Sequence, residues 1–330
     1  MMAAMNIDTR QAPMKGELLY RAKLAPFTTW RVGGEAEIIY RPFDADDLAG
    51  FIAANQDKTL TVLGAGSNVL IRDGGIKGVV VITAGTMTAI SNKGEIFRVE
   101  AGVGCPAFAT AVRKQQMAGA EFLSGIPGTI GGAIAMNAGA YGAEIWDLVE
   151  KIEVLNRQGQ ISELTKGDIE YGYRYCKLPK DSLVVAAHLR LRRAETDELE
   201  QLHENVRVLQ KKRSETQPLT QSNCGSVFKN PQGDYAARLI ETAGLKGEAI
   251  GGAQVSPKHA NFIVNNGTAT AANIEQLINR VKEQVKQVHG VELESEVRIL
   301  GEKGAVEKSI VEKSSGESAM KESKQEKGER

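Results

Sequence analysis

The feature that most constrains this chain is a glycine-rich segment, LSGIPGTIGGAIAMNAGAYG, at residues 123–142. Glycine accepts backbone conformations that other residues avoid, and it leaves room where a ligand must approach the main chain closely. The segment carries no charged side chain, so an anion bound there would be held by backbone N–H groups rather than by lysines. A second glycine turn, Gly64 to Asn68, follows the apolar run Leu60 to Leu63. Two strand-to-glycine-loop units predict a large, phosphate-bearing cofactor bound from two sides.

A third glycine turn, GVGCPA at residues 102–107, fits the relaxed dinucleotide fingerprint GxGxxG/A between a predicted strand and a predicted helix. The match is weak by itself, because Pro106 removes one helix N–H. A Rossmann domain and ordinary tight turns are therefore both alternatives for a single loop. The three loops together favour a cofactor site.

Composition excludes several classes of protein. The 330 residues allow two or three domains, and 41 basic residues balance 41 acidic ones, so no overall field attracts nucleic acid or an anionic membrane. No apolar run is long enough to cross a bilayer. Cys105, Cys176 and Cys224 have neither disulfide nor zinc-ligand spacing. We expect a soluble protein of the reducing cytoplasm, without a metal.

Strand, helix and glycine-turn patterns alternate from Leu24 to about Ala84. Residues 270–289 predict a long helix, because Ile274, Leu277, Ile278, Val281, Val285 and Val288 form one apolar stripe and Gly290 follows. The other predictions are helices over 45–55 with Asp44 as N-cap, 197–212 with Thr196 as N-cap and 235–243, and a strand over 291–300.

Five motifs occur in order along the chain: VLGAGSNVLI at 62–71, SGIPGTIGGAIAMNAGAYG at 124–142, YGYR at 171–174, CGSVFKNP at 224–231 and ESEVRILG at 294–301. Over about residues 20–301, the chain resembles the bacterial UDP-N-acetylenolpyruvoylglucosamine reductases. These flavoenzymes complete UDP-N-acetylmuramate synthesis for peptidoglycan, and so serve cell wall biogenesis, cell shape and cell division. The stretch between Arg174 and Ser226 lacks the insertion that carries a substrate-capping tyrosine, so the chain is similar to the shorter class of the family.

The resemblance implies a vanillyl-alcohol-oxidase (p-cresol methylhydroxylase)-type FAD-binding fold of two subdomains, followed by a C-terminal α+β substrate-binding domain. The expected boundaries are a flexible lead over 1–15, FAD-binding subdomains over 16–85 and 86–200, a substrate-binding domain over 201–301 and a disordered charged tail over 302–330.

By the same resemblance, FAD binds non-covalently and NADPH is the reductant. The implied FAD contacts are Gly64, Ala65, Gly66, Ser67, Asn68, Gly125, Ile126, Pro127, Gly128, Gly132, Asn137 and Gly139. The resemblance assigns catalysis to Arg174 and Glu296, which stabilise an enolate, and to Ser226, which protonates it. It assigns Lys229, Asn230 and His259 to the sugar-nucleotide substrate. An arginine fork suits a carboxylate whose negative charge is growing.

The implied reaction is reduction of UDP-N-acetylglucosamine enolpyruvate to UDP-N-acetylmuramate. A hydride passes from flavin N5 to the vinyl carbon of the enolpyruvyl ether, and we expect a monomer to carry this out. Two alternatives are an FAD-dependent sugar or alcohol oxidase of the same fold and a non-catalytic nucleotide-binding module.

Overall fold

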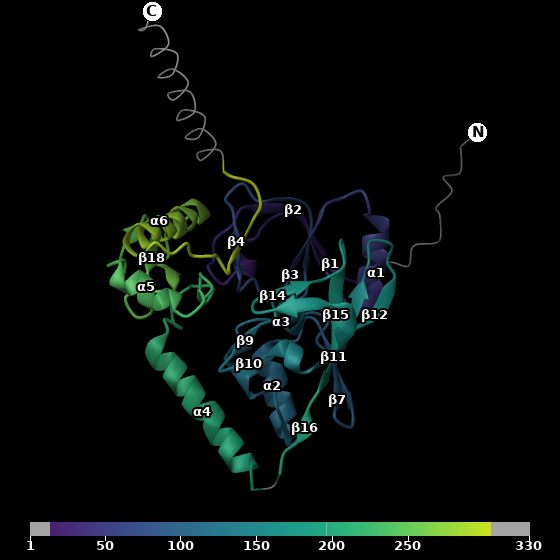
Figure 1. The fold of residues 1–330 in the computed structure, drawn as a ribbon. Helices are drawn as coiled ribbons and strands as arrows, with labels where there is room; N and C mark the ends of the chain where they lie inside the picture. The colour runs from purple at the N-terminus through teal and green to yellow at the C-terminus, as the bar shows by residue number, and fades with distance from the viewer. Residues whose placement is uncertain (1–13, 196, 305–330) are drawn as a thin grey trace, which may run out of the picture. The chain divides into compact units, whose positions relative to one another are not determined.

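The computed structural model describes residues 14–195 and 197–304 (Figure 1), so most of the predicted lead and charged tail lie outside the described residues. The chain divides into two compact units, and it passes between them several times. The first unit takes in residues 37–67 and 78–219 with the segment before residue 23, and the second takes in residues 23–36, 68–77 and 220 onwards. Within the described part of the chain, no helix combines the length and the apolar character that crossing a bilayer requires.

The smaller sheet of the first unit has the strand order β1-β2-β5-β3. Its strands are β1 (Glu17–Lys23), β2 (Glu35–Arg41), β5 (Ile76–Ile82) and β3 (Leu60–Leu63), and the ends of β1, β2 and β5 run into the second unit. Helix α1 (Ala45–Ala54) begins where the Asp44 side chain accepts a hydrogen bond from the Asp47 N–H, as predicted. It packs on this sheet through Phe51, whose ring stacks on Tyr40 with centroids 3.7 Å apart.

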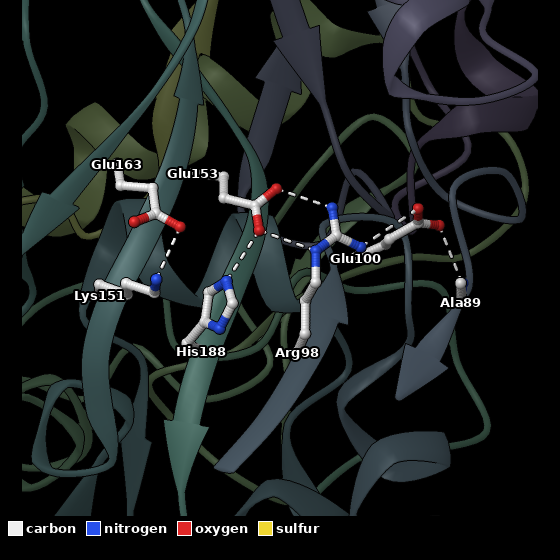
Figure 2. A network of polar contacts seen from close by, with 7 residues as sticks. All are labelled: Ala89, Arg98, Glu100, Lys151, Glu153, Glu163 and His188. Atoms are coloured by element: carbon white, nitrogen blue, oxygen red, sulfur yellow. Dashed lines mark hydrogen bonds and ion pairs between the residues drawn. The ribbon is translucent and has the colours of Figure 1, made fainter. Parts of the chain in front are cut away.

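The larger sheet of the first unit is antiparallel, with the order β12-β11-β15-β7-β6. Its strands are β12 (Ile161–Thr165), β11 (Val149–Leu155), β15 (Leu183–Arg190), β7 (Ile96–Glu100) and β6 (Ile90–Lys93). Helices α2 (Cys105–Lys114) and α3 (Ile130–Met136) pack on one face around Phe108 and Trp146. Polar side chains on β7, β11, β12 and β15 form the network of Figure 2.

Short elements complete the first unit and carry its loops. They are η2 (Glu121–Gly125), η3 (Ile145–Asp147), η4 (Lys166–Asp168) and the strand pairs β8 (Met117–Ala118) with β16 (Arg192–Arg193), β9 (Gly139–Ala140) with β10 (Ala143–Glu144) and β13 (Glu170–Gly172) with β14 (Tyr175–Lys177). Helix α4 (Leu199–Thr216) has Gln217 as its C-cap, and Pro218 follows. Its N-cap is Glu198, so the predicted start at residue 197 is wrong; the predicted cap Thr196 itself lies outside the described residues.

The second unit packs two helices on a three-stranded sheet around its own apolar core. Its elements are η1 (Ala25–Phe27), β4 (Val69–Ile71), α5 (Ala236–Thr242), β17 (Ala249–Ile250), β18 (Ala253–Val255), β19 (Ile263–Asn265), α6 (Ala271–His289) and β20 (Arg298–Leu300). Helix α6 confirms the predicted long helix: Thr270 caps its start and Gly290, with φ +69°, ends it. Only Val288 leaves the predicted stripe, since it is 49% exposed.

The predicted strand over 291–300 is wrong for its first part, because only β20 is a strand. Upstream, the backbone bonds irregularly to the CGSVFKNP segment: Lys229 N–H donates to the Glu294 carbonyl, and Glu296 N–H donates to the Val227 carbonyl. The alternation of apolar residues was genuine, because Leu293 and Val297 are buried. It reflects packing against the core without a continuous ladder.

Candidate functional site

Three glycine turns that lie far apart in the sequence meet in the first unit. Turn one, Gly64 to Ser67, touches the 123–142 segment: a Cβ on Gly64 would lie 2.3 Å from Thr129 Oγ1, and one on Gly128 would lie 3.5 Å from Ser67 Oγ. The first distance leaves no room for any side chain at Gly64. The structure therefore brings together the two loops that were predicted to bind one cofactor from two sides.

The third turn, residues 102–107, and Ala101 just before it support the glycine-rich segment through backbone hydrogen bonds. Gly131 N–H donates to the Ala101 carbonyl at 2.9 Å, and Ile130 N–H donates to the Val103 carbonyl at 2.8 Å. A Cβ on Gly131 would lie 2.8 Å from the Ala101 Cβ. This turn supports the other two through the backbone, so its partial match to a dinucleotide fingerprint is explained by packing.

Asn137 is fully buried at the C-terminal end of α3, where its backbone adopts φ +43°. Its side-chain amide is occupied by protein groups: Nδ2 donates to Glu144 Oε2 at 2.7 Å and to the Gly172 carbonyl at 2.9 Å. Its Oδ1 accepts from the Trp146 N–H at 3.4 Å. Its backbone groups also have protein partners, because its N–H donates to the Ile134 carbonyl and its carbonyl accepts from Arg174 Nη1. Asn137 therefore shapes the loops around it.

Arg174 stands at the tip of the β13–β14 hairpin with φ +55°, a left-handed conformation that is costly for a residue with a Cβ. Its Nη2 donates to the Gly139 carbonyl at 2.7 Å, and its Nη1 lies 3.8 Å from Glu144 Oε1. A Cβ on Gly139 would lie 3.2 Å from the Arg174 Nη1. The predicted catalytic arginine is thus anchored on the glycine-rich segment.

Glu144 was missed in the sequence. Its carboxylate accepts from Asn137 and faces Arg174, so it joins two predicted site residues. The sequence shows only that Glu144 is the first charged residue after the glycine-rich segment, which does not place it beside Arg174.

Ser226 and Glu296 lie on adjacent backbone segments of the second unit. Glu296 N–H donates to the carbonyl of Val227, the residue after Ser226, at 2.8 Å. Asn68 closes the same cluster, because its Nδ2 donates to the Glu296 carbonyl at 3.1 Å and its own carbonyl accepts from the Arg298 N–H. Parallel pairing of β20 with β4 sets this register.

Cys224, two residues before Ser226, is 4% exposed. Burial raises the pKa of its thiol well above the ordinary value, and the negative charge of Glu296 raises it further. A protonated thiol is a poor nucleophile, so Cys224 is unsuited to nucleophilic catalysis.

The three residues that the resemblance assigned to substrate already have protein partners in the second unit. Lys229 Nζ pairs with Glu294 Oε1 at 2.5 Å, and Asn230 Oδ1 accepts from the Ala236 N–H at the start of α5. Burial lowers the pKa of His259 below its ordinary value, and its ring packs edge-on against Phe262. The neutral imidazole fits a packing or hydrogen-bonding residue better than an acid.

One cluster has metal-ligand character: atoms of Glu153, Glu163 and His188 lie within 4.8 Å of one another. Figure 2 shows that cations of the protein already occupy it. Arg98 Nε and Nη2 each donate to one oxygen of Glu153 at 2.7 Å, and Lys151 pairs with Glu163. Burial alone would raise the pKa of Glu153, but the hydrogen bonds from Arg98 and His188 outweigh it and hold the pKa below its ordinary value. This network binds strands together.

Comparison with known proteins identifies the class first. A family model described as "FAD binding domain" matches residues 36–165, and one described as "UDP-N-acetylenolpyruvoylglucosamine reductase, C-terminal domain" matches residues 217–300. The glycine turns lie largely in the first match and Ser226 and Glu296 in the second. The chain is an FAD-dependent oxidoreductase whose FAD-binding fold is followed by a C-terminal α+β domain, as predicted.

The family follows from the relatives. The chain is 49% identical to the UDP-N-acetylenolpyruvoylglucosamine reductase of Methylococcus capsulatus over 88% of this chain and 95% of that protein. It is 46% identical to the reductase of Alkalilimnicola ehrlichii over 87% of this chain and 96% of that protein. The crystal structure of the Thermus caldophilus reductase superposes with a TM-score of 0.74 at 32% identity, covering 87% of this chain and all of that one. The chain belongs to the UDP-N-acetylenolpyruvoylglucosamine reductase family of peptidoglycan synthesis.

Proposed function

We propose that the protein reduces UDP-N-acetylglucosamine enolpyruvate to UDP-N-acetylmuramate, with NADPH as the reductant. The observation that carries the proposal is the anchoring of Arg174 on Gly139, because it joins a fixed cation to the glycine-rich segment. The high identity to relatives named for this reaction supports the choice of substrate.

The residues present fit FAD. Gly64 packs on the Thr129 hydroxyl, which joins the two loops, and the small residues of both loops are largely half-buried, so part of their main chain is accessible. Backbone N–H groups at such turns suit a pyrophosphate. We propose that the FAD contacts are those that the resemblance implied, with Asn137 acting indirectly by shaping the loop.

FAD held by the two glycine loops would supply the hydride chemistry, which carries a hydride from NADPH to the vinyl carbon of the enolpyruvyl ether. Hydride addition at that carbon leaves negative charge on its neighbour, delocalised onto the substrate carboxylate. Arg174 opposes this growing charge with a guanidinium already oriented by Gly139 and Glu144.

Ser226 then gives its hydroxyl proton to the carbanionic carbon, which completes the saturated lactyl ether. Glu296 acts on the enolate together with Arg174. A carboxyl group donates a hydrogen bond to an enolate only when it is protonated, so Glu296, ionised beside Cys224, would take up a proton before this step. Lys229 and Asn230 bind the sugar nucleotide, for which Lys229 would exchange its partner Glu294 for a phosphate.

An anaerobic absorbance experiment on the purified protein tests this function. The preparation should be yellow, NADPH should bleach the visible band and the enolpyruvyl substrate should restore it. A colourless protein that FAD cannot reconstitute contradicts the proposal. Turnover of a free sugar with oxygen and without NADPH would support the alternative oxidase instead.

A further inference from the structure

The last turn of α4 lies against the glycine-rich segment of the first unit. The Arg213 Cδ is 3.8 Å from the position that a Cβ would take on Gly125, in the segment's first turn. Four residues earlier on the same helix, the Leu209 carbonyl accepts a hydrogen bond from the Tyr141 hydroxyl at 3.3 Å. Helix α4 is thus attached to both ends of the segment through Gly125 and Tyr141.

Arg213 differs from the other partly buried arginines of the described chain in what its guanidinium meets. Arg72 and Arg98 are each held by two carboxylate oxygens, and Arg157 donates to three backbone carbonyls. Arg213 donates through Nε to Gln217 Oε1 at 2.7 Å, and within residues 14–195 and 197–304 no carboxylate pairs with it and no acceptor bonds its terminal nitrogens.

The surroundings of Arg213 disfavour its charged form. Burial lowers the pKa of Arg213 below its ordinary value, and the Tyr141 oxygen compensates only in part. An arginine stays charged even so, and a half-desolvated cation without an anion costs free energy. The described part of the chain supplies no such anion to Arg213.

We propose that Arg213 binds a phosphate group of a nucleotide that lies against residues 125–128. A guanidinium fork with both terminal nitrogens available matches two phosphate oxygens. The inference rests on the proposed function, which supplies three phosphates of this chemistry: the FAD pyrophosphate, the 2′-phosphate of NADPH and the diphosphate of the sugar nucleotide.

A merely structural arginine is the alternative. Its stem would cover apolar surface, and its charge would favour the C-terminal end of the α4 dipole. Removing it would then change thermal stability and leave every ligand constant unchanged.

The test uses full-length holoenzyme with Arg213→Gln, Arg213→Lys and the control Arg207→Gln. Arg207 lies on the same helix with its side chain 80% exposed, paired with Glu204. Three quantities are measured: the dissociation constant of FAD from flavin release on dilution, the ratio of kcat/KM for anaerobic flavin bleaching by NADPH and NADH, and the dissociation constant of UDP.

Arg213→Gln should raise the dissociation constant of FAD or of UDP, or lower the NADPH-to-NADH ratio, about tenfold. Arg213→Lys should recover part of the loss, and Arg207→Gln should show none of it. Weaker binding of FAD identifies the FAD pyrophosphate as the ligand of Arg213, and weaker binding of UDP identifies the diphosphate of the sugar nucleotide. A lower NADPH-to-NADH ratio identifies the 2′-phosphate of NADPH. If all three quantities stay within twofold of wild type and only the melting temperature changes, Arg213 does not bind a phosphate. A wild-type protein that takes up no FAD would overturn the proposed function itself, and this inference with it.

Discussion

At the residue scale, the site depends on a few positions whose backbone or neighbours allow one residue type. Arg174 adopts φ +55° although it has a Cβ, and Gly64 has no space for one. Strain of this kind persists where the surrounding structure enforces it, often at functional sites. Both positions therefore allow experiments that separate stability from activity.

Replacing Arg174 by glycine and by alanine should separate its backbone strain from its chemistry. Both variants lose the guanidinium, so in both the enolpyruvyl substrate should reoxidise the reduced flavin about 10²–10³-fold more slowly. Arg174→Gly should be about 1–2 kcal/mol more stable than Arg174→Ala, because only alanine pays for a Cβ at this φ. Melting temperatures and single-turnover reoxidation measure the two effects. Equal stability of the two variants would show that the hairpin tip relaxes.

Gly64→Ala should cost about 1–3 kcal/mol and weaken FAD retention, because the new Cβ meets Thr129 Oγ1. Gly50→Ala is the control: it lies within α1 with open space around it, and it should gain about 0.5–1 kcal/mol. Denaturant titration and flavin retention on dilution are the measurements. Removing the hydroxyl in Gly64→Ala/Thr129→Ala should recover part of the loss, and purely additive costs would contradict the steric explanation.

At the element scale, ion pairs attach helices and loops to the short strands that carry the site. In the second unit, Arg72 follows β4 and donates to both carboxylate oxygens of Glu275 on α6, at 2.9 and 2.8 Å. The β4 strand also pairs with β20, just after Glu296. The ion pair therefore connects α6 to the pair of strands that sets the position of Glu296.

The Arg72–Glu275 pair predicts a pH-dependent stability. The hydrogen bonds from Arg72 lower the pKa of Glu275 below its ordinary value, so this contribution is present above the unfolded-state pKa of about 4.3. It is lost as the pH falls through the folded-state pKa. Glu275→Gln should lower the free energy of unfolding by about 1–3 kcal/mol at pH 7 and by progressively less below pH ~4.

Urea titrations at several pH values measure the Glu275→Gln effect. Glu283→Gln, an exposed position on the same helix, should stay within about 0.5 kcal/mol of wild type throughout. A Glu275→Gln deficit that does not change with pH would assign the loss to packing instead of charge.

At the scale of the whole molecule, the chain distributes its proposed tasks between two units. The glycine turns and Arg174 belong to the first unit, and Ser226, Glu296 and the sugar-nucleotide residues belong to the second. This division predicts that the two half-reactions separate on mutation.

Ser226→Ala should leave FAD uptake and bleaching by NADPH within about twofold of wild type. Reoxidation by the enolpyruvyl substrate should slow about 10²–10⁴-fold, because only that step needs a proton from Ser226. Anaerobic stopped-flow absorbance measures each half-reaction. Equal loss of both would remove Ser226 from the donor role and point to a structural effect.

The sequence by itself determined the features that depend on local pattern. Helix α6 was predicted with its cap and its C-terminal glycine, because a 3.6-residue apolar period and cap residues act within a few turns. The glycine turns, the family and the FAD-binding class were also readable, since five motifs keep their order whatever their distances in space.

Tertiary structure alone decided which distant groups meet. The predicted strand over 291–300 shrank to β20, because its upstream backbone bonds with the loop around Val227. The burial of the Asn137 amide, the position of Glu144 beside Arg174 and the lack of a carboxylate for Arg213 in the described chain also depend on contacts across many residues. Hydrogen bonds and desolvation act over a few ångströms of space, so no spacing along the chain could have indicated them.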